Sequence, residues 1–309
     1  MEHLKPLLNL LFTKKNYVNN YLSIVIGLKS YSLKELIEWL LWHKFIGVDH
    51  FYIFDDNSSV SVERALENYK NFITFVSETD YKKSFVPLGK SPLITAQDNR
   101  RGYKPTMYSY VYKKYRHESQ WMAFIDDDEF IFPLKEKELK VFLRQVENEN
   151  SLVLQWRNFS PEGKSKTPTD GIIFDHYKRF QQGRAIKMIV NCKKIKSIFK
   201  KNHFFTSQGI DASKNKVHLK CSTLDYLVKE PYFALNHYSM KSLEDAKSKL
   251  YRGYEGKIED QGLEFTCEKL LKLAVAYSNP KNFNLPFNFS KDFKPLRKSF
   301  IKFLKSSSK

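Results

Sequence analysis

Short apolar runs and amphipathic segments alternate along the first part of the chain. The run Ser23–Gly27 is rich in β-branched residues and predicts a buried strand, and His50–Phe54 predicts a second one. Between them, apolar residues from Leu33 to Leu41 recur at helical spacing. A strand, a helix and a strand within about 30 residues make a β-α-β unit, so we expect the two strands to be parallel.

The predicted helix has a recognisable signal at each end. Ser32 and Glu35 stand three residues apart, which is the spacing of a capping box. Gly47 follows the last apolar positions and suits a left-handed C-terminal stop.

The same alternation continues after residue 60 and shows no internal repeat. Residues 156–175 are polar, contain Pro and Gly, and predict a loop over a site. We therefore predict an α/β fold with a mostly parallel sheet flanked by helices. The further elements expected are helices at Val62–Tyr69, Pro105–Tyr115, Leu139–Val146, Leu243–Leu250 and Leu263–Ala276, and strands or apolar segments at Phe72–Val76, Trp121–Ile125, Leu152–Trp156, Ile186–Asn191 and Tyr232–Leu235.

The C-terminal residues combine an apolar and a basic pattern. Residues 291–309 carry seven Lys and Arg side chains against the one acid, Asp292. This pattern fits a basic amphipathic helix on an anionic membrane, and it fits equally a helix packed on the main domain with a solvated lysine face. The residues that fall on one apolar face are Phe293, Leu296, Phe300, Phe303 and Leu304.

Composition and charge narrow the class of protein. With 309 residues, 42% of them hydrophobic, the chain can bury a core, and its net charge of +18 suits nucleic acid, an anionic membrane or a phosphorylated small molecule. The three cysteines lack zinc spacing, as expected in a reducing compartment. No run approaches the ~18–20 apolar residues of a spanning helix, and we expect no signal peptide. We therefore expect a cytoplasmic protein, soluble or at the inner face of the plasma membrane, with a basic leader segment 1–20, a main domain 21–240 and a basic helical extension 241–309.

Four consecutive carboxylates, Asp126 to Glu129, directly follow a predicted strand. Their mutual repulsion favours a bound cation, and ligands of open α/β sheets gather beyond the carboxyl ends of strands. Asp126 and Asp128 point the same way in an extended chain, and carboxylates suit Mg²⁺ or Mn²⁺. An exposed acidic turn is the alternative, but a second strand-end cluster at Asp55-Asp56 favours the metal site.

An ordered set of short motifs resembles glycosyltransferase family 92 and related family-2-like glycosyltransferases, over residues 23 to 255. The chain departs from that family at Lys29-Ser30-Tyr31, where Lys-Asn-Glu is usual, and at Ser160, where glycine is usual. The matching residues are Glu38-Trp39, His43, Gly47-Val48, Phe51 to Ser59, Trp121 to Phe130, Gln155 to Phe159, Lys187 to Val190, and His237-Tyr238 with Lys241-Ser242.

The resemblance implies a GT-A fold, a nucleotide-sugar donor, and Mn²⁺ or Mg²⁺. It places Asp55 near the uracil or ribose, Asp126 at ribose or metal, and Asp128 on the metal. His237 is implied as a late metal ligand, with a packed or surface histidine as the alternative. Lys187 and Lys241 are implied to neutralise the leaving diphosphate, or are ordinary surface lysines.

The chemistry of sugar transfer requires a general base for the acceptor hydroxyl as well as charge stabilisation on the diphosphate. We expect Glu162, in the predicted acceptor loop, to be this base, with Asp170 as the alternate. Trp156 and Phe159 stack on a sugar face in this interpretation, or else belong to the core.

The leading hypothesis is a metal-dependent, inverting hexosyltransferase that moves sugar from a UDP-sugar to a cell-envelope glycan such as lipopolysaccharide, with the tail on an anionic membrane and no nucleic acid as partner. The net charge and aromatics also fit a nucleic-acid-binding protein or a carboxylate-metal nuclease. The missing Lys-Asn-Glu fits a third alternative, a non-catalytic membrane-associated scaffold.

Overall fold

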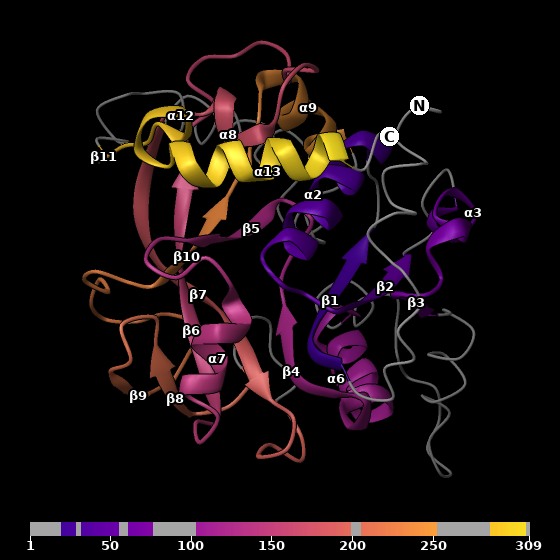
Figure 1. The fold of residues 1–309 in the computed structure, drawn as a ribbon, viewed down its shortest axis with the longest axis vertical. Coiled ribbons are helices and arrows are strands. Elements are labelled where there is room, and N and C mark those ends of the chain that lie inside the picture. The colour runs from indigo at the N-terminus through magenta and orange to yellow at the C-terminus, as the bar shows by residue number, and fades with distance from the viewer. Residues whose placement is uncertain are drawn as a thin grey trace.

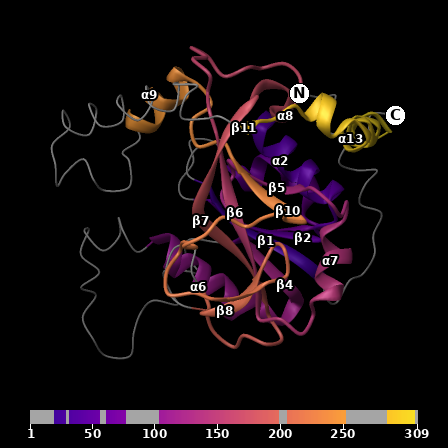
Figure 2. The same ribbon diagram turned by 90° about the vertical axis from the view of Figure 1, so that its left-hand side faces the viewer.

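The computed structural model describes residues 20–28, 32–55, 61–76, 103–198, 205–251 and 285–306, and their strands form one mixed sheet with helices on both faces (Figures 1 and 2). The strands are β1 (Asn20–Leu28), β2 (His50–Asp55), β3 (Ile73–Val76), β4 (Ser119–Phe124), β5 (Glu129–Pro133), β6 (Ser151–Phe159), β7 (Arg179–Asn191), β8 (Gln208–Asp211), β9 (Lys216–His218), β10 (Phe233–His237) and β11 (Leu285–Pro286). The helices are α2 (Leu33–Phe45), α3 (Val62–Ala65), α6 (Tyr103–Tyr115), α7 (Leu139–Gln145), α8 (Ile173–His176), α9 (Leu243–Tyr251), α12 (Phe289–Asp292) and α13 (Lys294–Ser306), with 3-10 turns at Glu67–Tyr69 and Arg116–Glu118.

The sheet runs in the order β3-β2-β1-β4-β7-β6-β10-β5. Its first half is parallel, because β1 pairs in parallel with both β2 and β4, and β2 pairs in parallel with β3. The β7 strand then enters antiparallel between β4 and β6. The predicted β-α-β unit and the α/β class are therefore confirmed.

Alternate residues of the central strands enter two separate cores. In β1, Leu22, Ile24 and Ile26 pack on the side of α2, whereas Val25 packs on the side of α6. Figure 2 shows α6 on one side of the sheet and α2, α7 and α13 on the other. Because both faces are covered, the central strands read as continuous apolar runs, which is why the sequence identified them.

The α2 helix occupies the predicted residues, but its start differs from the prediction. The Ser32 side chain makes no capping hydrogen bond, so the predicted capping box is wrong, and the Glu35 carboxylate instead accepts a hydrogen bond from Lys241 Nζ at 2.6 Å. The stop is confirmed, since Gly47 adopts a φ of 104° just after the helix.

The polar segment predicted as a loop from residue 156 begins later. The β6 strand continues through Phe159, so the prediction is wrong for its first residues. Strand β5, directly after the acidic residues, was not predicted at all. The predicted helix Leu263–Ala276 and the leader 1–20 lie almost wholly outside the described residues.

The C-terminal segment returns to the main body of the protein. Strand β11 pairs with β7, and α13 crosses over α2 (Figure 1). Phe300 is fully buried, with ring centroids 5.0 Å from Trp42 and 5.2 Å from Phe45. The apolar face of α13 thus packs on the domain, which is the second of the two alternatives left open by its pattern. No helix in the described ranges is long and apolar enough to cross a bilayer.

Candidate active site

The acidic residues form a tight turn between β4 and β5 at the carboxyl edge of the parallel strands. The backbone N–H of Glu129 donates to the carbonyl oxygen of Asp126 at 3.1 Å, which closes the turn. The turn is held from below by α2, because Trp39 Nε1 donates to the Glu129 carbonyl at 2.7 Å and Trp42 Nε1 donates to the Ile131 carbonyl at 2.9 Å. These two hydrogen bonds therefore anchor the acidic turn and the start of β5 to α2.

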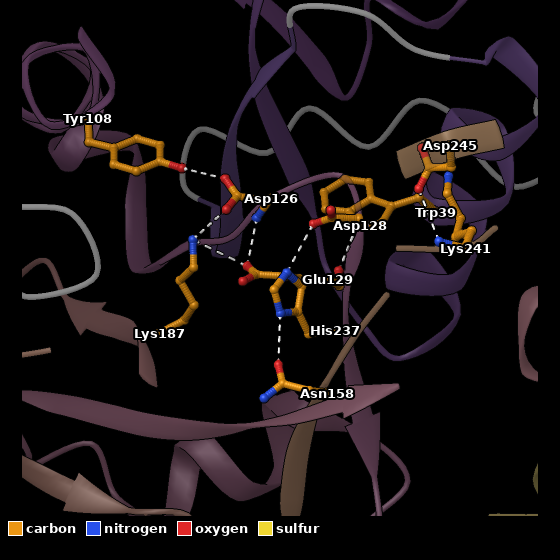
Figure 3. A network of polar contacts seen from close by, with 10 residues as sticks. All are labelled: Trp39, Tyr108, Asp126, Asp128, Glu129, Asn158, Lys187, His237, Lys241 and Asp245. Atoms are coloured by element: carbon orange, nitrogen blue, oxygen red, sulfur yellow. Dashed lines mark hydrogen bonds and ion pairs between the residues drawn. The ribbon is translucent and has the colours of Figure 1, made fainter. Parts of the chain in front are cut away.

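Lys187 joins the first and last acids of this turn (Figure 3). Its Nζ lies 2.8 Å from Asp126 Oδ2 and 3.3 Å from Glu129 Oε2, and its side chain is only 1% exposed. The same Glu129 oxygen accepts from the Asp126 backbone N–H at 2.8 Å, and Tyr108 OH donates to Asp126 Oδ1 at 3.4 Å. This network fixes the Asp126 carboxylate in one direction.

Glu129 lies at the bottom of the network and is fully buried. Burial raises the pKa of its carboxyl, while the positive charge of Lys187 acts in the opposite direction. Its Oε1 has no hydrogen-bond partner among the described residues. Lys187 therefore compensates the buried Glu129 carboxylate and the partly exposed Asp126 carboxylate, and its role in neutralising the leaving diphosphate stays a prediction.

On the other side of the turn, Asp128 faces His237, the last residue of β10 (Figure 3). His237 Nε2 lies 3.6 Å from Asp128 Oδ1. The opposite ring nitrogen, Nδ1, donates to Asn158 Oδ1 at 3.0 Å, so in the neutral ring the Nε2 lone pair points at the carboxylate. A lone pair that faces a carboxylate favours a cation between them.

Asn158 is positioned by two neighbouring strands. It stands beside His237 in the parallel β6–β10 register, and Gly183 of β7 leaves room for its side chain. A Cβ at Gly183 would lie 2.8 Å from Asn158 Nδ2. Trp156 closes the same corner, with its ring centroid 4.2 Å from that of His237.

This corner suits a divalent cation. Asp128 and His237 lie close enough for one ion to bind both, a carboxylate oxygen and an imidazole nitrogen are ordinary ligands of Mn²⁺, and Asn158 orients the imidazole as metal-site histidines require. Asp126 turns toward Lys187 in the same turn. The described residues hold no group of three His, Cys, Asp or Glu side chains that could together hold a metal ion.

A cleft open to solvent adjoins Asp128, and Lys187 does not line it. Its lining combines five carboxylates and two lysines with one tyrosine and one phenylalanine. The residues that line it are Lys34, Glu35, Glu38, Asp127, Asp128, Phe130, Thr167, Pro168, Asp170, Gly171, Ile173, His176, Tyr177 and Lys241.

The two acids expected as catalytic base have different surroundings. Glu162 adopts a φ of 52°, accepts a hydrogen bond from the Lys178 backbone N–H at 2.8 Å and lies 3.7 Å from Lys164 Nζ. It does not line the cleft, whereas Asp170 does. Glu162 thus braces the loop in this structure.

The remaining predicted residues lie in three places. Lys241 lines the cleft and pairs with Glu35 at 2.6 Å. Asp55 lies at the same sheet edge as Asp126, since β1 pairs with both β2 and β4, and its carboxylate accepts from Val62 N at 3.2 Å. Phe159 is fully buried and stacks on Tyr238 with centroids 4.6 Å apart, so it belongs to the core and does not face the cleft.

Sequence reasoning missed two residues of the site. Asn158 falls two positions after Trp156. A predicted strand that continued to Phe159 would have placed both residues on one face, because side chains alternate along a strand. Glu38 was quoted only as part of a motif, although it stands on the α2 turn after Lys34 and Glu35 and lines the cleft with them.

The sequence matches a described protein family over most of its length. The family model for glycosyltransferase family 92 covers residues 28–255. A glycosyltransferase family 92 protein of Ricinus communis is 23% identical over 232 residues, which cover 70% of this chain and 35% of the relative. One from Arabidopsis thaliana is 21% identical over 230 residues, with the same shares. The chain thus spans about a third of the length of the curated relatives it matches.

Solved structures show a more distant likeness. HddC from Yersinia pseudotuberculosis aligns with a TM-score of 0.36 and 13% identity, over 74% of this chain and 97% of that protein. TarS from S. aureus aligns with a TM-score of 0.36 and 12% identity, over 92% of this chain and 49% of TarS.

Proposed function

The chain belongs to glycosyltransferase family 92, as its motifs predicted, and from this premise we propose that it transfers a hexose from a nucleotide-sugar, a UDP-sugar, to an acceptor hydroxyl. One observation carries the proposal beyond the family. Asp126 and Asp128 meet Lys187 and His237, which come much later in the sequence, at the carboxyl edge of the sheet (Figure 3). Ligands of open α/β sheets bind at this edge.

In this proposal Asp128 and His237 hold Mn²⁺ or Mg²⁺. The ion, when bound, neutralises charge that develops on the leaving diphosphate. Asn158 fixes the imidazole so that Nε2 faces the ion site, and Lys187 holds the Asp126 carboxylate toward the donor ribose or ion. Lys241, in the cleft beside Asp128, supplies a second positive charge near the diphosphate.

The proposed acceptor is a cell-envelope glycan such as lipopolysaccharide, with inversion at the transferred carbon in a single displacement. Lysines exposed on α13 support an approach to an anionic surface at the inner face of the plasma membrane. Because the apolar face of the helix packs on α2, the proposed contact is electrostatic and does not rely on insertion.

The proposal is tested by UDP release from UDP-glucose, UDP-galactose and UDP-N-acetylglucosamine, with and without Mn²⁺. The wild type should bind UDP only with the metal and hydrolyse at least one donor slowly. Asp128→Ala should lose about 100-fold or more of this rate, because one metal ligand is gone. Glu63→Ala, at an exposed acid of α3, is the matched control and should behave as wild type. Absence of metal-dependent UDP binding in the wild type would contradict the proposal.

A further inference from the structure

The cleft beside Asp128 is separate from the Lys187 network but shares a wall with the proposed metal corner. Asp128 lines the cleft on one side and faces His237 on the other. A hydroxyl group bound in the cleft therefore lies next to the position of the donor diphosphate. The mixed polar and aromatic lining suits a sugar, whose hydroxyls need donors and acceptors and whose ring packs on aromatic side chains.

Glu38 lies in the wall of this cleft and is held in place by the backbone. Its Oε1 accepts from the Ile173 N–H, at the start of α8, at 2.7 Å. The neighbouring residue Trp39 donates to the Glu129 carbonyl, so the α2 turn that carries Glu38 is fixed to the acidic turn. A carboxylate on this rigid element has a defined direction, unlike one on a free loop.

We propose that the cleft binds the acceptor hydroxyl and that Glu38 is the general base which removes its proton; this inference rests on the proposed sugar transfer. The acceptor oxygen forms a bond to the anomeric carbon as the bond from that carbon to the diphosphate oxygen breaks. The bonding electron pair leaves with UDP, and the acceptor proton passes to Glu38 and then to solvent. Atoms and charge balance without a further reactant.

The electrostatics of the cleft agree with this role. Burial raises the pKa of the Glu38 carboxyl to about 7, with the Ile173 N–H, Lys34 and Lys241 lowering it and Glu35 raising it. Asp127, Asp170, His176 and Tyr177 are the other ionisable groups that line the cleft with Asp128. A base with a pKa near the working pH is the effective kind.

The other acids nearby fit the role less well. Glu162 accepts from the Lys178 N–H outside the cleft, and Glu35 is paired with Lys241. Asp170 lines the cleft from the polar loop after β6, whereas Glu38 stands on α2 between the buried residues Ile37 and Trp39. Glu38 alone of these combines a place in the cleft with a rigid support.

The test compares wild type with Glu38→Gln, using water as the acceptor. The glutamine keeps an oxygen that accepts from the Ile173 N–H, so the fold should persist, which thermal unfolding checks. We expect Mn²⁺-dependent UDP binding, measured by calorimetry, to be unchanged, and hydrolysis of the UDP-sugar to fall about 100-fold or more. Glu63→Gln, on α3, is the matched control.

The outcomes separate this inference from the proposed function. A variant that hydrolyses the donor at the wild-type rate would overturn the role of Glu38 and leave the transferase proposal intact, and losses in Asp170→Asn or Glu162→Gln alone would move the role to those acids. A wild type that neither binds nor hydrolyses UDP-sugars would overturn both. Should Glu38→Gln unfold, the wild-type pH profile decides: kcat/KM should rise through an apparent pKa of about 7, and a flat profile overturns the role.

Discussion

At the scale of single residues, Lys187 is a buried positive charge that is compensated by two carboxylates. It is buried between Asp126 and Glu129, in a strand whose neighbours are apolar. The sequence marked it because a lysine flanked by Ile186 and Met188 is unusual for a surface position. Its partners could not be predicted, because they come from a turn about 60 residues earlier in the chain.

Replacing Lys187 by methionine should destabilise the domain by about 3–5 kcal/mol, since it leaves the buried Glu129 carboxylate and the partly buried Asp126 carboxylate without their cation. Urea unfolding measures the difference. Lys216→Met is the matched control, because Lys216 also forms an ion pair, with Glu149, but is 77% exposed and should cost about 0–1 kcal/mol. Equal losses in the two variants would show that Lys187 does not compensate buried charge.

His43 gives a second prediction, for the pH dependence of stability. Burial lowers the pKa of its ring from 6.5 to about 3, so the folded protein keeps it neutral where the unfolded chain takes up a proton. Above pH 6.5 the ring is neutral in both states and has no effect on the free energy of unfolding. As the pH falls from 6.5 toward 3, only the unfolded chain takes up the proton, so the free energy of unfolding decreases. In urea titrations, the wild type should lose about 1.4 kcal/mol more per pH unit in this window than His43→Gln. Parallel pH curves for the two proteins would contradict the assignment.

At the scale of elements, the sequence predicted the elements that are apolar throughout. It missed the strands, or parts of strands, that contain both polar and apolar residues. The β1 and β2 strands and α2 follow from their patterns, because both faces of the central sheet are buried. The β6 strand was predicted to end at Trp156 because Arg157 and Asn158 are polar. The structure continues it, since Asn158 bonds to His237 at the end of the sheet and the Arg157 guanidinium lies over the Phe180 ring. Strand β5 was missed because it begins at Glu129, the last of four consecutive acids that are more typical of a turn.

Asn158 tests whether the end of β6 supports the metal corner. Asn158→Ala should weaken Mn²⁺ binding about 10- to 100-fold, because the His237 ring loses the partner that orients it. Titration with Mn²⁺ in the presence of UDP measures the affinity. The control is Asn150→Ala, whose side chain bonds only to the exposed Gln208 among the contacts described for it. Unchanged Mn²⁺ affinity in Asn158→Ala would exclude His237 as an oriented ligand.

At the scale of the whole molecule, charge is distributed unevenly. The net charge is +18, yet carboxylates gather in the acidic turn and in the cleft. Composition alone left nucleic acid, membrane and phosphate ligands as equally good partners, because it does not say where in the molecule the charged residues lie. The fold places exposed lysines along α13, on the helix surface that does not pack on α2.

This lysine surface, formed by Lys294, Lys298, Lys302 and Lys305, should bind vesicles that contain phosphatidylglycerol at low salt and release them as NaCl is raised. Changing Lys298, Lys302 and Lys305 to glutamate should abolish sedimentation with the vesicles. A control with the same change in net charge, at the exposed Lys70, Lys135 and Lys216, should retain binding. If both triple variants lose binding alike, the net charge is responsible and α13 has no special part.

The packing of α13 on α2 also has a consequence for the order in which the protein is made. Trp42 holds the strand after the acidic turn through its indole N–H, and its ring is covered by Phe300. Synthesis proceeds from the N-terminus, so a nascent chain on the ribosome lacks the Phe300 contact to Trp42 until residue 300 has emerged. The aromatic cover of α2 is therefore completed by a segment that is translated long after α2, and ribosome-bound intermediates that stop before residue 300 should expose an aromatic surface for chaperones to bind.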